Sequence, residues 1–444
     1  MKISNAAKRR ICGFILALAC ASVARAQEFT PVGAERAGNK DGTIPEWTGG
    51  DPGGGPQKGM YPSNDVYDSE KPLFTITKDN YEKYADKLTD GHKELLKRFD
   101  TYKMNVYRTH RSVRFPIFIN DATRANAKTC TLTGTDEIDG CKQGFPFPSP
   151  KTGAEVVWNH KLKWRGNAVR RYNNQLIVQP SGSFQQTKIL EEAQFLYANN
   201  LNAAPMVKGA GPYLRYLSQT LAPPRLAGTF ILVHERMGTG TEGRAAWIYE
   251  PGIKRLRRAP TVQYDNPYEG TDGNQFYDQV DLFNGALDRY NWKIVGKKEM
   301  YLPYNSNNIG SPKVSFKQMV SPKHLNQDLS RYELHRYWVV EATLKSGVAH
   351  TFKRRVLYFD EDSWDLEAVD CYDNKDQLYK LQEGHLVYQS NIESATGVPE
   401  VIYDFQSGRY FITAAANEDT PNDFTVLYPP DYFSPESVQR KILK

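Results

Sequence analysis

Hydrophobic and polar residues alternate regularly along residues 332–344, and this pattern predicts a β-strand. The even positions, from Tyr332 to Leu344, are mostly apolar, whereas the odd positions, from Glu333 to Thr343, are mostly polar. Because successive side chains of a strand point to opposite faces, this period of two indicates a half-buried strand.

Other β-rich runs lie on both sides of this strand, at residues 176–178, 229–233, 245–249, 348–359, 364–372 and 377–387. The last three follow residues 332–344 through short polar connections such as Ser346-Gly347, and connections of that kind join antiparallel neighbours. Since strands and helices do not alternate over long stretches, the pattern argues against a doubly wound parallel sheet. We predict a mainly β fold with some helices, built on a large antiparallel sheet.

Apolar residues at helical spacing predict three helices, at residues 79–99, 121–129 and 153–162. Gly91 is expected to interrupt the first helix or to join two pieces. Thr152 and Glu155 have the spacing of a capping box, in which each side chain satisfies a backbone N–H at the start of the third helix.

Residues 29–67 are rich in Gly, Pro, Asn and Asp. The glycines and prolines of segment 47–56 are incompatible with a regular helix or an interior strand. We interpret this stretch as an extended arm laid over the body of the protein, with a disordered linker as the alternative. The residues expected to anchor the arm by burial are Phe29, Val32, Ile44 and Trp47.

The N-terminus has the order of regions typical of an export signal. Basic residues precede an apolar run at residues 11–20, and Ala24 and Ala26 provide the small residues of a cleavage site. The apolar run is about half as long as the roughly 20 residues that span a bilayer. We predict a signal peptide at residues 1–26 and a periplasmic protein. Acylation of Cys20, which would tether the protein to a membrane, is the alternative.

Five basic and no acidic residues lie in this signal, so the formal charge of +6 falls to +1 in the mature chain. A nearly neutral chain lacks the broad basic field that nucleic acids attract, which argues against nucleic acid as a partner.

Three cysteines remain after the signal. Cys130 and Cys141 enclose a short polar stretch, and in an oxidising compartment we expect them to form a disulfide. Cys371 is expected to be a buried thiol, because free cysteines are among the most buried residues.

Glycine spacing at residues 238–243 matches the dinucleotide-binding fingerprint, which requires a following helix to bind the pyrophosphate. A β-rich run follows instead, so we interpret the segment as a hairpin loop and expect no cofactor. Asp360-Glu361-Asp362 lacks the alternating ligands of a calcium loop and is interpreted as a solvent-exposed turn. The eight histidines are scattered, and no nucleophile elbow occurs. The sequence thus predicts neither a metal site nor a catalytic centre.

One dense basic run follows the turn at Pro251-Gly252 and contains Lys254, Arg255, Arg257 and Arg258. A solvated strand edge protected by charge is the first interpretation. Contact with an anionic headgroup or an acidic partner is the second.

Several longer strings resemble the DUF1329 family of exported Gram-negative proteins. They are TPVGAERAGN at 30–39, DGTIPEWTGG at 41–50, WNH at 158–160, WRG at 164–166, WIYEPG at 247–252, DLFNG at 281–285, VGKKEMY at 295–301 and DEDSW at 360–364. The resemblance covers nearly the whole mature chain. It implies similarity to the LolA and LolB lipoprotein carriers, whose curved antiparallel sheet forms a half-open barrel with helices as a lid. It also implies links with RND-type transporters and with DUF1302-type exported proteins, but no catalytic residues.

We therefore divide the chain into a signal peptide (1–26), an arm and helical segment with the disulfide loop (27–150) and an antiparallel β body resembling a carrier (151–444). The expected function is a periplasmic binding protein or carrier for a lipid or other hydrophobic molecule, with helix 153–162 as a lid. The residues predicted to line its cavity are Trp158, Leu162, Trp247, Tyr249, Trp338, Val340 and Trp364. A non-carrier interaction protein that docks on a transporter or the outer membrane is the alternative, and an enzyme acting on a lipid or glycan ranks third.

Overall fold

The computed structural model describes residues 28–50, 67, 69–198, 211–238, 240–260 and 264–442. The predicted signal peptide, Cys20 and part of the predicted arm lie outside these ranges. The β-rich pattern of the sequence appears as one fifteen-stranded sheet and one two-stranded hairpin.

The strands of the large sheet are β1 (Phe74–Ile76), β2 (Met104–Val106), β5 (Ala168–Val178), β6 (Phe184–Phe195), β7 (Pro212–Ala222), β8 (Phe230–Arg236), β9 (Arg244–Glu250), β10 (Arg255–Arg258), β11 (Tyr290–Pro303), β12 (Tyr332–Leu344), β13 (Arg354–Asp360), β14 (Leu366–Tyr372), β15 (Leu378–Gln389), β16 (Ser394–Asp404) and β17 (Tyr410–Ala415). The hairpin consists of β3 (Thr131–Thr133) and β4 (Glu137–Asp139). The helices are η1 (Tyr81–Lys87), α2 (Asp90–Arg98), α3 (Ile117–Thr129), α4 (Gly153–Lys161), α5 (Gly240–Gly243), η2 (Tyr277–Gln279), α6 (Phe316–Met319) and α7 (Pro435–Ile442).

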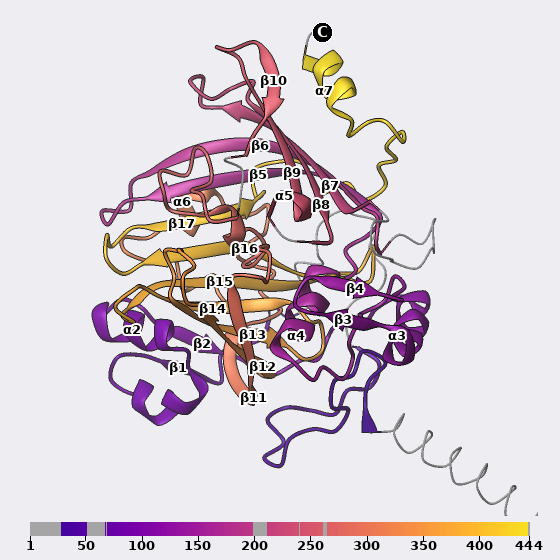
Figure 1. Cartoon of the computed structure of the whole chain (residues 1–444). Coiled ribbons are helices and arrows are strands. Elements are labelled where there is room, and N and C mark those ends of the chain that lie inside the picture. Colours follow the sequence, from indigo (N-terminus) through magenta and orange to yellow (C-terminus); the bar gives the residue numbers. More distant parts are fainter. Residues whose placement is uncertain are drawn as a thin grey trace, which may run out of the picture.

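The sheet runs from β1 and β2 through β12–β17 to β5–β10, with β11 added beside β12, and among the described residues its two ends are not joined (Figure 1). Its strand pairs are antiparallel except for one parallel bridge between Val106 of β2 and Tyr332 of β12. The last strand, β17, pairs with β5, so Val178 lies beside Tyr410. This pairing joins strands β5–β10 and strands β11–β17 into one sheet. The predicted curved antiparallel sheet with helices is confirmed.

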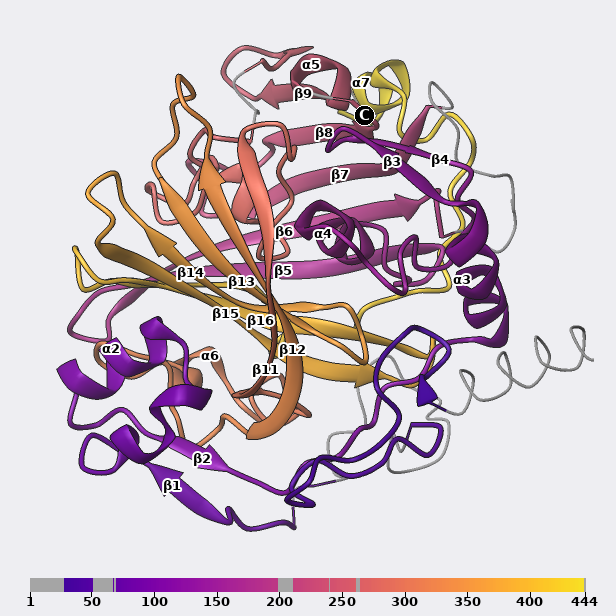
Figure 2. The same cartoon turned by 60° about the horizontal axis from the view of Figure 1, so that its bottom comes forward.

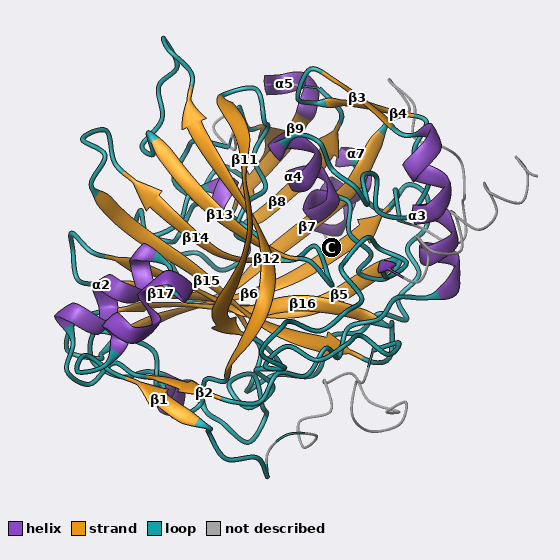
Figure 3. Ribbon diagram, turned by 90° about the horizontal axis from the view of Figure 1, so that it is seen from below, coloured by secondary structure: helices purple, strands orange, loops and turns teal. Residues whose placement is uncertain are grey.

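The sheet curls around α4, which lies inside the curve (Figures 2 and 3). The helix contacts β11 and β12 on one side, and its Trp158 packs edge-on against Tyr213 of β7 on the other. The predicted capping box opens this helix: the Glu155 N–H donates to Thr152, and the Thr152 N–H donates to Glu155. Eight of its nine residues are buried, so the helix fills the part of the concavity next to β11 and β12 and does not cover it from outside.

The strand predicted to be half-buried, β12, has its predicted bounds but is buried on both faces. Val340 and Ala342 belong to a cluster on the α4 side, while Tyr337 and Val339 belong to a second cluster shared with α2 and α6. The single-face prediction was wrong because separate segments of the chain cover each face.

The first predicted helix is divided at Leu88 and Thr89, not at Gly91. Thr89 accepts a hydrogen bond from the His92 N–H and begins α2. Gly91 lies in the first turn of α2, where an added Cβ would come within 2.6 Å of Leu381. The glycine thus permits close packing of the helix on β15 and does not break it.

The described part of the predicted arm, residues 28–50, is largely irregular and lies against the body. Val32 and Ile44 are buried, and Trp47 is half-buried with its indole N–H donating to the Val113 carbonyl. The Trp364 indole donates to the Val32 carbonyl. These contacts support the interpretation as an arm.

A disulfide joins Cys130 to Cys141, the pair identified from the sequence, and encloses the β3–β4 hairpin. Replacing both cysteines with serine should lower the free energy of unfolding by about 3 kcal/mol, because a loop of this length loses the restriction that the bond places on the unfolded chain. Urea unfolding measures the change. The wild type under reducing conditions should match the variant, and equal midpoints for the variant and the oxidised wild type would contradict the prediction.

Candidate functional site

A cavity of about 160 Å³ lies inside the curve of the sheet, where β5–β8 come near β16 and β17. Its apolar wall includes Val169, Phe195, Leu214, Ile231, Val233 and Val398. The segment that carries η2 contributes Tyr277 and Val280 to its lining. Since a cavity of about 150 Å³ can hold benzene, this one has room for one end of a larger apolar molecule.

Three arginines line the cavity, and each is paired with a carboxylate that also lines it. These pairs are Arg165 with Asp281 (2.8 Å), Arg171 with Glu191 (2.7 Å) and Arg244 with Glu235 (2.7 Å). Burial raises the pKa of Asp281, but the charges of Arg165 and Lys163 outweigh burial and hold it well below its ordinary value. The three arginines of the lining are therefore all held in closed ion pairs.

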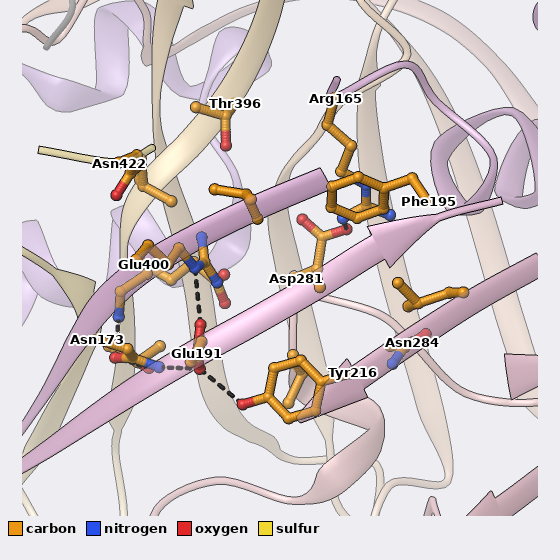
Figure 4. A pocket seen from close by; sticks show the side chains of 18 of the residues that line it. Arg165, Asn173, Glu191, Phe195, Tyr216, Asp281, Asn284, Thr396, Glu400 and Asn422 are labelled. Atoms are coloured by element: carbon orange, nitrogen blue, oxygen red, sulfur yellow. Dashed lines mark hydrogen bonds and ion pairs between the residues drawn. The ribbon is translucent and has the colours of Figure 1, made fainter. Parts of the chain in front are cut away.

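Neighbouring side chains hold these carboxylates in place. The Asn173 amide and the Tyr216 hydroxyl both donate to Glu191, at 2.8 Å each, and the Tyr264 hydroxyl donates to Glu235 at 3.1 Å. Figure 4 shows Asn173, Glu191 and Tyr216 gathered on one side of the cavity, away from Asp281. These polar groups thus have fixed positions beside the apolar part of the wall.

Glu400 of β16 also lines the cavity and is only 7% exposed. It accepts a 3.4 Å hydrogen bond from the Leu282 N–H, and among the described residues it forms no ion pair. Burial, reinforced by the charge of Asp281, raises the pKa of Glu400 to about 8. The carboxyl group is therefore mainly protonated at neutral pH.

The seven residues predicted to line a cavity do not meet around this one. Trp158, Leu162, Val340 and Trp364 are buried in the hydrophobic cluster between α4 and the sheet. Trp338 is half-buried and stacks on Trp364, with ring centroids 6.1 Å apart.

Trp247 and Tyr249 lie on the opposite face of β9 from the cavity. Trp247 is paired with Leu232 in the sheet and shares the cluster of Leu232 and Phe433 near the C-terminus. The cavity is lined instead by Ile231 and Val233, the neighbours of Leu232 along β8. Alternation groups residues by face, but it does not say which face encloses a space.

Sequence reasoning missed Arg171, Glu191, Glu235 and Glu400. A weak signal existed, since Glu191 and Glu400 stand inside the β-rich stretches ILEEAQF and PEVIYDF. A charged residue is buried only when it is paired or changes its ionisation, so an acid inside such a run indicates a special environment. The signal does not identify the partner, which comes from another strand.

The interpretation of Asp360-Glu361-Asp362 as a solvent-exposed turn was wrong, because all three residues are at most 4% exposed. Both carboxylate oxygens of Asp362 accept hydrogen bonds from Arg111, at 2.6 and 2.8 Å. Ligand atoms of His335, Asp360 and Asp362 lie within 4.8 Å of one another. Since Asp362 is bound to Arg111 and His335 contacts Glu333 at 3.0 Å, this cluster serves to anchor neighbouring segments.

The basic run forms the edge strand β10, and Lys254, Arg255, Arg257 and Arg258 are exposed. Arg257 pairs with Glu250 at 2.6 Å, and Arg258 lies over the Trp247 ring. The edge is thus solvated and charged, as the first interpretation predicted; contact with a headgroup or acidic partner stays a prediction.

Comparison with known proteins gives one family and several relatives. The family model described as "Protein of unknown function (DUF1329)" matches residues 75–439. "Uncharacterized protein PA3922" of Pseudomonas aeruginosa is 40% identical over 419 residues, which cover 93% of this chain and 91% of that protein.

Two solved structures show a distant likeness. A DUF1329 family protein from Desulfovibrio piger has a TM-score of 0.43 at 14% identity, covering 64% of this chain and 95% of that one. The LolA superfamily protein NE2245 from Nitrosomonas europaea has a TM-score of 0.39 at 10% identity, covering 64% and 98%. Within the described residues, every helix is too short or too polar to cross a membrane.

Proposed function

Since the chain belongs to the DUF1329 family, we propose that it is a periplasmic binding protein or carrier that receives one end of a lipid or other hydrophobic molecule in the cavity of β5–β8. The observation that supports the proposal is the lining itself. Binding sites for small molecules are concave and mostly apolar, with a few fixed polar groups that set orientation. Phe195, Leu214 and Ile231 provide the apolar wall of such a site, and Glu191, fixed by the hydrogen bond from Asn173, provides one of its polar groups.

The volume of the cavity limits the proposal to part of a ligand. The side of the concavity next to β11 and β12 is filled by α4 and its cluster, which includes Trp158 and Val340. The cavity of about 160 Å³ next to β5–β8 accommodates a short apolar segment, so the rest of a longer molecule would extend outside it.

Location and partners follow from the predicted signal peptide and the family resemblance. In this proposal the protein works in the periplasm by binding and not by catalysis. An RND-type transporter and a DUF1302-type exported protein would supply or receive the ligand.

One observation favours a second function, docking on a membrane or a membrane protein without carrying a ligand. The turn before β10 exposes 52% of Ile253 beside the exposed cations Lys254 and Arg255. An apolar tip flanked by positive charge suits an anionic membrane surface.

A cavity-filling variant tests the carrier function. Ala193 of β6 lines the cavity, and Ala193→Leu should reduce bound hydrophobic molecule to less than about one tenth by occupying its space. The measurement is mass spectrometry of solvent extracts from protein expressed with its full-length gene and purified from the periplasm without detergent. About one molecule per wild-type chain is expected.

Gln194→Leu is the matched control, because it introduces the same side chain at the next position, which does not line the cavity. It should retain the ligand. An empty wild-type cavity with a co-purifying membrane protein would overturn the carrier function in favour of docking. Equal ligand content in both variants would show that the bound molecule lies elsewhere.

A further inference from the structure

Among the described residues that line the cavity, every arginine is already paired with a carboxylate. No unpaired positive charge is therefore left for an anionic ligand. Arg165, Arg171 and Arg244 are each engaged by a carboxylate within 2.8 Å. An anionic head group would have to break one of these pairs or bind the free Nε–H of Arg165, and in either place it would face Asp281 or Glu191 at close range. Because these side chains are largely buried, both changes are costly.

Several acceptors that line the cavity lack donors. The side-chain oxygens of Gln275 and Gln389 are buried and accept no hydrogen bond from the protein. Glu400 accepts only the long bond from Leu282 among the described residues. Arg165 has one buried N–H without an acceptor, but Asp281 already matches its charge. The protonated carboxyl of Glu400 also offers one O–H, so the free capacity consists of the acceptors on Gln275, Gln389 and Glu400 and of two donors, the Arg165 Nε–H and the Glu400 O–H.

We propose that the cavity selects a molecule whose polar end donates hydrogen bonds and carries no negative charge, an alcohol or an amine, with Glu400 as the group that receives it. This inference rests on the proposed binding function and adds a ligand class to it. Free fatty acids and phosphate groups should bind more weakly, because their negative charge would lie near Asp281 and Glu191.

The two head groups would use Glu400 differently. Because burial raises the pKa of Glu400 to about 8, the carboxyl is mainly protonated at pH 7 and accepts an alcohol O–H through its carbonyl oxygen. An ammonium group would favour the ionised carboxylate, so Glu400 would release its proton as the amine binds. Alcohol binding releases no proton.

Three amphiphiles with the same eight-carbon tail test the inference: octanol, octylamine and octanoate. Titration calorimetry on the full-length gene product, purified from the periplasm and freed of lipid, should give octanol and octylamine dissociation constants at least about tenfold lower than that of octanoate at pH 7. Titrations in buffers of different ionisation enthalpy should show close to one proton released per octylamine bound and none per octanol.

Variants at Glu400 separate the head-group contact from burial of the tail. Glu400→Val should weaken octanol and octylamine about tenfold and leave octanoate unchanged. Glu400→Gln should keep octanol binding and abolish proton release by octylamine. Glu192→Gln is the control, because this residue contacts Tyr432 and Lys441 and does not line the cavity, and it should leave all three affinities unchanged.

The outcomes distinguish this inference from the function on which it rests. If none of the three compounds binds in a manner sensitive to Ala193→Leu, the proposed binding function is wrong. If they bind there but octanoate binds as tightly as octanol, or if the Glu400 variants change nothing, only the ligand class is wrong.

Discussion

Replacing Arg111 with methionine should lower the free energy of unfolding by about 3–5 kcal/mol, the usual cost of removing one partner from a buried ion pair. Arg111 is 5% exposed, and Asp362 would lose both hydrogen bonds to it. Within the described residues, Asp362 has no other cationic partner. Methionine fills similar space but leaves this carboxylate buried without a cation.

The same substitution should loosen the N-terminal arm. The guanidinium also donates to the carbonyls of Glu35 and Arg36, at 2.7 and 3.1 Å. Trypsin should therefore cleave after Arg36 or Lys40 at least about tenfold faster in the variant under native conditions. The reason is that losing these hydrogen bonds lowers the free energy needed to open the arm locally. Urea unfolding and timed proteolysis give the two measurements.

Arg124→Met is the matched control. Arg124 pairs with Asp121 on the surface of α3, and both side chains are more than 60% exposed. An exposed pair contributes less than about 1 kcal/mol, so this variant should unfold and be cleaved like the wild type. If Arg111→Met behaved like the control, the assignment of Arg111 as the anchor of the arm would be wrong.

Glu400→Gln should become more stable relative to the wild type as pH rises. The pKa of Glu400 is about 8 in the folded protein and 4.5 ordinarily, so the unfolded chain ionises first. The contribution of the protonated carboxyl is complete below pH 4.5 and is lost as pH rises toward 8. A pKa difference of this size lowers the free energy of unfolding of the wild type by roughly 5 kcal/mol between pH 4 and pH 9. Glutamine does not titrate, so the variant does not lose this contribution.

Chemical unfolding of both proteins at pH 4 and pH 9 measures this difference. Ala193→Leu, which changes the same cavity without a titrating group, should keep the same stability relative to the wild type at both values. A Glu400→Gln difference that stayed constant over this range would show that Glu400 ionises normally, and would remove the protonated acceptor from the proposed site.

The elements of the fold that could be predicted are those fixed by local signals. Alternation along residues 332–344 predicted the bounds of β12, and the spacing of Thr152 and Glu155 predicted the start of α4. Both signals act between residues close in the chain, so one sequence contains them in full. Burial of the second face of β12 was not predictable, because Glu333 and His335 are covered by segments remote in sequence.

The site depended on pairings that local patterns do not contain. Arg171 and Glu191 face each other only because β5 and β6 pair in one register. Asp362 looked like a turn residue because its partner, Arg111, lies far earlier in the chain. Trp247 and Tyr249 were predicted to line the cavity, but the register with β8 places them on the face that packs near α7.

The position of β17 beside β5 bears on how the molecule is made. Val178 of β5 pairs with Tyr410, and Val106 of β2 pairs with Tyr332. The β5–β17 and β2–β12 pairings can therefore form only after most of the chain is available. Contacts between distant residues slow folding. In a polypeptide that crosses a membrane from its N-terminus, as the predicted signal peptide implies, the consecutive strands β5–β10 can pair early, but the sheet is completed only after β17 has emerged.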